Sequence, residues 1–146
     1  METVSSFIGT DVCCNGKVIG RITDFLIDFR NKYIRGINCI SNLGIIRTPF
    51  IVDKSGILHL DRNGVVVDAK KIRYKKMYIE EYSNIGISQK NVFSSGSMGD
   101  VYFDPDPLEL KSISVKKGFL DDLIFGREIL DINDISVTDK GIIVRE

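Results

Sequence analysis

The sequence predicts an all-β fold of two tandem small antiparallel β-barrels with short helical turns. Three observations support this prediction. Short runs rich in β-branched and aromatic residues are typical of strands, and turn sequences containing Asn-Gly, Asp or Pro separate these runs. The second half of the chain also repeats the first at an offset of about 76 to 77 residues. Many short strands in a module of this size are typical of a small barrel or sandwich.

The repeat is clearest in the segments 20–28 and 96–104. Each segment begins with Gly, has Asp four residues later, continues with three apolar residues and ends with a second Asp. The match extends to three further pairs of segments: 7–9 with 84–86, Ile37 with Ile113, and 64–67 with 141–144. A tandem duplication explains the constant offset, and it predicts a first domain at 1–76 and a second at 77–146.

In the first half, strands are expected to alternate with tight turns. Asn15 and Gly16 favour the positive φ angles of a type I′ turn, so residues 12–14 and 17–19 are predicted to form a hairpin. The other predicted strands of this half are 21–28, 33–39, 57–60 and 65–67.

The second half follows the same plan, with one addition. Its predicted strands are 100–104, 110–115, 135–138 and 142–144. Pro105 and Pro107 bracket a turn, because proline does not fit inside a central strand. The apolar residues at 119–124 have helical spacing but form too short a run for an independent helix. We expect a single turn that plugs one end of the barrel, with a shorter counterpart at 43–46.

Composition excludes several function classes. The chain has 146 residues, and its 20 basic residues balance 20 acidic ones, so no global charge attracts nucleic acid or anionic membrane. No run approaches the roughly 20 apolar residues of a membrane span, and the start resembles no secretory signal. We therefore expect a cytoplasmic protein without a membrane span.

Three cysteines are a poor disulfide framework, and Cys13 and Cys14 are expected to be small apolar strand residues.

The junction at 68–77 contains neither Pro nor Gly, so it is not a flexible linker. Modules of about 70 residues bury little surface alone. We therefore expect the two modules to touch, to share core and to be related by a pseudo-two-fold axis. Further self-association into a homo-oligomer stays an open alternative.

The repeated Gly-x-x-x-Asp-(three apolar)-Asp segment, with its turn and returning strand, resembles the PRC-barrel domain, a family named for the photosynthetic reaction centre H subunit. The resemblance continues from 47–50 to 65–67, and from 127–129 to 141–144. It implies a small, mostly antiparallel barrel per copy, and binding or scaffolding instead of catalysis. The chain is most similar to the stand-alone members, some of them sporulation-associated. It lacks the transmembrane helix of the H subunit and the RNA-contacting barrel of the ribosome maturation factor.

Duplicated carboxylates invite a metal or acid–base interpretation at Asp24 and Asp28, and at Asp100 and Asp104. On a strand, residues four apart lie on one face but about 13 Å apart, too far to share an ion. We expect these carboxylates to accept backbone N–H bonds near turns.

His59 is the only histidine and no nucleophile motif accompanies it. The sequence predicts no catalytic residue, no metal ligand and no cofactor, and therefore no enzyme.

A basic run at the junction is the best functional candidate: Lys70, Lys71, Arg73, Lys75 and Lys76. Ile72 and Tyr74 alternate with it, which predicts a strand with one apolar and one charged face. The run could bind a protein partner or RNA phosphates, or it could simply protect an edge strand from aggregation. We predict a non-enzymatic protein–protein interaction or scaffolding module with an unidentified protein partner. The alternative is an RNA- or ribosome-associated assembly factor that acts through this run.

Overall fold

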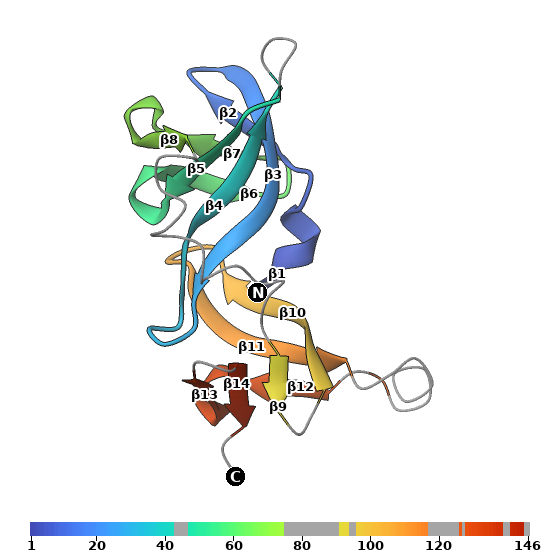
Figure 1. The fold of residues 1–146 in the computed structure, drawn as a ribbon. Coiled ribbons are helices and arrows are strands. Elements are labelled where there is room, and N and C mark those ends of the chain that lie inside the picture. Colours follow the sequence, from blue (N-terminus) through green and yellow to red (C-terminus); the bar gives the residue numbers. More distant parts are fainter. Residues whose placement is uncertain are drawn as a thin grey trace.

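The computed structural model describes residues 1–42, 47–74, 91–93, 96–116, 126, 128–138 and 141–144. Within these ranges, a single mixed sheet of 14 strands curls on itself, and the helical segments are short 3-10 turns (Figure 1). The strands are β1 (Glu2–Thr3), β2 (Asp11–Cys14), β3 (Lys17–Asp28), β4 (Tyr33–Ser41), β5 (Pro49–Asp53), β6 (Ile57–Asp61), β7 (Gly64–Val67), β8 (Ile72–Tyr74), β9 (Asn91–Phe93), β10 (Gly96–Asp104), β11 (Glu109–Lys116), β12 (Glu128–Asp131), β13 (Ile135–Thr138) and β14 (Gly141–Val144). The turns are η1 (Val4–Phe7), η2 (Lys54–Gly56), η3 (Ala69–Lys71) and η5 (Ile132–Asp134). The prediction of a mostly-β fold is confirmed.

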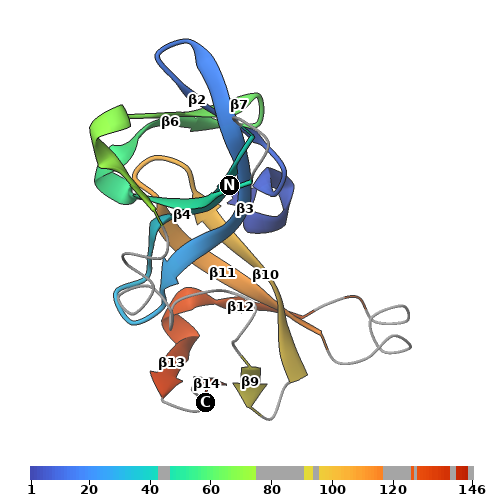
Figure 2. The same ribbon diagram turned by 45° about the horizontal axis from the view of Figure 1, so that its top comes forward.

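The first-half strands curl around a common interior in the order β6-β7-β2-β3-β4-β5-β8 (Figure 2). All neighbours are antiparallel except β2 and β7, which run parallel. The predicted turn between β2 and β3 is confirmed, because Asn15 and Gly16 both have positive φ, 53° and 77°. One difference from prediction is that β3 runs unbroken through Gly20. Glycine is required there because a Cβ would collide with the Ile40 carbonyl oxygen of β4.

The second-half strands repeat this order as β13-β14-β9-β10-β11-β12, with β9 and β14 again parallel. The pairing register also recurs at the offset of the sequence repeat. Phe25 pairs with Ile37 across β3 and β4, and Val101 pairs with Ile113 across β10 and β11. Register shifts fall at matching places in both pairs. The sequence repeat is therefore a repeat of strand pairing.

The duplicated aspartates stabilise backbone at matching positions. Asp24 accepts a hydrogen bond from the Phe25 N–H, and Asp100 accepts one from the Val101 N–H, both at 2.8 Å. Asp28 and Asp104 each accept a backbone N–H from the turn that follows, at 3.0 and 3.2 Å. The expected bonds to the backbone near turns are confirmed for Asp28 and Asp104, whereas Asp24 accepts a backbone N–H within β3 itself. Asp100 also accepts hydrogen bonds from the backbone N–H and the hydroxyl of Ser5 in η1.

The two halves meet at the tips of the β3–β4 and β10–β11 hairpins. Ile34 N–H donates to the Leu108 carbonyl at 2.8 Å, and Leu110 N–H donates to the Lys32 carbonyl at 2.9 Å. Lys32 and Leu108 occupy matching positions in the two tips, and both have positive φ, 62° and 70°. The exchange of bonds is reciprocal, as between two chains related by a two-fold axis.

A shared core lies behind this seam. Phe7, Phe25 and Phe103 are completely buried, and the Phe103 ring packs in a tilted arrangement with its centroid 5.6 Å from those of both other rings. Buried residues of both halves belong to the same hydrophobic cluster. The two halves of the chain therefore touch and share core, as expected, within one continuous curled sheet.

Three predicted features lie outside the described residues. They are the domain boundary between residues 76 and 77, the helical turn at 119–124 and its shorter counterpart at 43–46.

Candidate functional site

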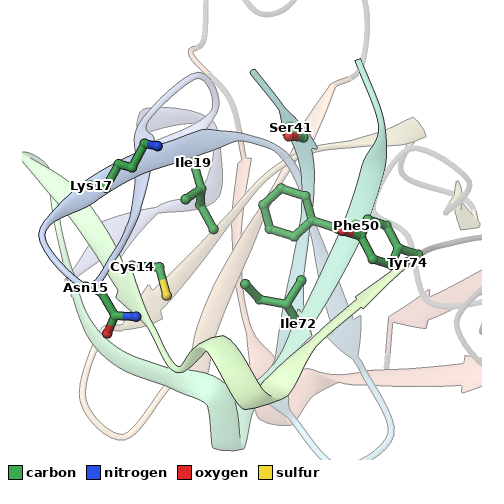
Figure 3. A pocket seen from close by; sticks show the side chains of 8 residues that line it. All are labelled: Cys14, Asn15, Lys17, Ile19, Ser41, Phe50, Ile72 and Tyr74. Carbon is green, nitrogen blue, oxygen red and sulfur yellow. The ribbon is translucent and has the colours of Figure 1, made fainter. Parts of the chain in front are cut away.

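A pocket of about 340 Å³ opens between the β2–β3 hairpin and the β5–β8 pair. Figure 3 shows Ile19, Phe50 and Ile72 pointing toward one another across it. The residues that line the pocket are Cys14, Asn15, Lys17, Ile19, Ser41, Phe50, Ile72 and Tyr74. Its volume lies within the range of ordinary ligand and anchor-residue pockets.

The solvent exposure of the lining residues increases from the buried floor of the pocket to its open rim. Phe50 and Cys14 are buried, Ile19 and Ile72 are half-buried against the core, and the Tyr74 side chain is 52 % exposed. The curl of the sheet creates this space, because β8 pairs with β5 and not with β2 or β3 in the described part of the chain. An apolar floor with a wet rim suits an apolar side chain that enters from solvent.

The charge at the rim is positive. Among the lining residues named above, Lys17 is the one charged residue. Cys39 is not among the lining residues, but it pairs with Phe50, which is, across β4 and β5. Burial raises the pKa of the Cys39 thiol well above its ordinary range, so it stays protonated. The site therefore offers apolar contact and one cation.

Of the segment that carries the predicted basic run, Ile72 and Tyr74 line the pocket, whereas the described basic residues Lys70, Lys71 and Arg73 do not. Lys70 is exposed in η3, and Lys75 and Lys76 lie outside the described residues. Arg73 donates from its guanidinium to the carbonyl oxygens of Lys70 and Ile72, at 2.8 and 3.1 Å. Arg73 thus covers backbone acceptors of its own edge strand, which matches the protective role weighed in the sequence analysis.

Lys71 also has a structural role. It is half-buried, and a Cβ on Gly56 would collide with its Cβ. The stem of Lys71 therefore packs over the turn between β5 and β6. In the described part of the run, Lys70 is the fully exposed cation.

A second cleft of about 540 Å³ follows the seam between the halves. Lys32 donates to Asn133 Oδ1 there at 3.1 Å, and Lys54 Nζ lies 5.2 Å from the Tyr33 ring centroid. These polar groups already engage one another, so the cleft has no clear charge preference.

His59 lies elsewhere, on β6, where its Nε2 is 2.7 Å from Asp61 Oδ2. Within the described ranges, no three His, Cys, Asp or Glu side chains converge as a metal site would require.

Sequence reasoning missed the pocket itself. The alternation of Ile72 and Tyr74 with basic residues was the available signal, and it correctly predicted a strand with an apolar face.

The chain matches no protein-family model, and a search of curated proteins likewise found no match. No helix in the described residues is long and apolar enough to cross a membrane.

Proposed function

We propose that this protein is a non-enzymatic interaction module made of two tandem PRC-like barrels, at 1–76 and 77–146. The matching strand order and register of the two halves support the duplication. The reciprocal bonds at the seam support a pseudo-two-fold arrangement. The duplicated carboxylates of the curled sheet accept backbone hydrogen bonds, which fits a scaffold better than a catalyst.

The observation that carries the proposal is the apolar pocket beside β8. It is open to solvent, it is floored by Phe50 and Cys14, and Lys17 gives its rim a positive charge. We propose that it receives one aliphatic or aromatic side chain from an acidic segment of a protein partner. Lys70 is also exposed, in η3 just before β8.

Affinity capture from native cells with matched variants tests this proposal. Tyr74→Ala removes part of the rim, and Lys17→Glu reverses its charge. Both are expected to lose a partner that the native chain retains, because anchors in such pockets dominate binding energy. Leu58→Ala is the control, since Leu58 is 64 % exposed on β6 away from the pocket. It is expected to retain the partner.

The outcomes separate the competing functions. Unchanged capture by both pocket variants would refute the pocket as the docking site. Loss of all retained material on RNase treatment would favour the RNA-associated alternative over a protein partner. Melting curves of each variant show whether a loss of binding reflects a loss of folding.

A further inference from the structure

Strands β5 and β12 are counterparts in the two halves. Val52 of β5 pairs with Ile37 of β4, and Leu130 of β12 pairs with Ile113 of β11 in the same register. Each strand ends in an Asp whose carboxylate accepts a backbone N–H of the following 3-10 turn, at 3.0 and 2.8 Å. The two strands can therefore be compared residue by residue.

Their outer edges differ. The outer edge of β5 is covered by β8, where Arg73 pairs with Ile51, and Ile51 is completely buried. In the described residues, β12 pairs with β11 alone. Ile129, the counterpart of Ile51, is 52 % exposed. The unpaired backbone N–H and C=O groups of an edge strand are a template for strand addition, and an exposed aliphatic residue beside them offers an apolar contact.

We propose that the outer edge of β12 binds an extended segment of a partner protein as an added antiparallel strand, in the place that β8 takes on β5. This inference rests on the proposed interaction function and adds a second docking surface to it. β8 itself shows the chemistry that fits such an edge, with the basic Arg73 between the apolar Ile72 and Tyr74. The added strand makes main-chain bonds, and its alternate side chains give specificity.

Charge complementarity also favours a basic segment. Asp131 and Asp134 are exposed at the end of β12 and in η5. Asp134 is the counterpart of Gly56, the residue over which Lys71 packs in the first half. A lysine that precedes the added strand would therefore meet a carboxylate where Lys71 meets a glycine.

The same charges disfavour a second copy of this chain as the occupant. Two β12 strands paired antiparallel about their centre would place Glu128 of one copy opposite Asp131 of the other. Like charges directly opposite destabilise a strand pair. The occupant that fits this edge is therefore an apolar–basic–apolar segment of a different protein.

A peptide with the sequence of residues 69–74, labelled with fluorescein, is a suitable probe for the full chain. Fluorescence anisotropy is expected to show saturable binding. Ile129→Lys is expected to weaken it about tenfold, because the lost apolar contact corresponds to roughly one decade in affinity. Leu58→Lys, at a comparably exposed aliphatic residue on β6, is the matched control and is expected to bind like the native chain.

Two N-methylated peptides test strand addition directly. One carries methyl groups on the amides of the Lys71 and Arg73 positions, and the other on those of the Ile72 and Tyr74 positions. Alternate residues of an added strand donate N–H bonds to the edge. One peptide is therefore expected to lose binding and the other to retain it, and equal binding by both would refute strand addition.

Three results would overturn the inference. They are no peptide binding to the native chain, equal binding to Ile129→Lys, and a dimer of the native chain that Ile129→Lys dissociates. If the peptide instead displaced β8 from β5, the native chain and Ile129→Lys would bind it equally, and the inference would also fail. Tyr74→Ala, which tests the pocket, is expected to leave peptide binding to β12 intact, so the two proposals can fail separately.

Discussion

Replacing Phe103 with alanine tests whether the two halves fold as one unit. The Phe103 ring is completely buried at the seam and lies 5.6 Å from the centroids of both Phe7 and Phe25. Removing a buried phenylalanine destabilises a domain by about 3–5 kcal/mol. The two ring contacts alone account for about 0.5–1.5 kcal/mol each of this range.

We therefore expect Phe103→Ala to lower the free energy of unfolding by about 4 kcal/mol. Urea titration followed by circular dichroism measures this change. Leu58→Ala is the control, because an exposed aliphatic residue is expected to change stability by about 0.5 kcal/mol or less.

Phe103→Ala is also expected to destabilise strands of both halves. Phe25 belongs to β3 and Phe103 to β10, so the cluster joins strands of both halves. Hydrogen exchange followed by mass spectrometry is expected to show faster exchange in β3 and β10 together. Faster exchange confined to β10, or a loss below about 1 kcal/mol, would refute a core shared across the seam.

Three further predictions concern single sites. Gly36→Ala is expected to lower the free energy of unfolding by about 1–3 kcal/mol, as measured in urea, because the new Cβ would collide with a backbone carbonyl of β5. The hydrogen bond from His59 holds the pKa of the Asp61 carboxyl below its usual range, so this bond stabilises the fold above the ordinary pKa of Asp and is lost as the pH falls through the folded value. In His59→Ala, an NMR titration is expected to show the pKa of Asp61 raised toward its usual value, and an unchanged midpoint would contradict this account. Because burial raises the pKa of Cys39, maleimide is expected to label the half-exposed Cys13 in the native protein and to spare Cys39, and equal labelling would be evidence against it.

Local chemistry explains which parts of the fold were predictable. The Asn15–Gly16 turn and the duplicated aspartates follow from residues close together in sequence, and the structure confirms them. β5 was not predicted as a strand, because Phe50, Ile51 and Val52 form a continuous apolar run without alternation. All three are buried, so the strand has no polar face to give a period of two.

The pocket was unpredictable for a different reason. It joins Ile19 on β3 to Ile72 on β8, and this proximity depends on the order of the strands between them. The closing step is the parallel pairing of β2 with β7, which brings distant segments together. No local pattern encodes such a pairing, because its energy comes from burial after the sheet has curled.

The differences between the copies point to where their functions diverge. Gly56 is required in the first half because Lys71 packs against it as the chain enters β8. The matching residue in the second half, Asp134, is exposed, and Ile129 is exposed where Ile51 is buried. At this edge glycine is thus replaced by aspartate, and the isoleucine that both copies keep changes from buried to exposed. An edge that accepts a strand of the same chain becomes an acidic edge with one apolar contact. A merely unused edge would be expected to lose its aliphatic residue, whereas this edge keeps Ile129 and gains charge, which fits a basic strand from another protein.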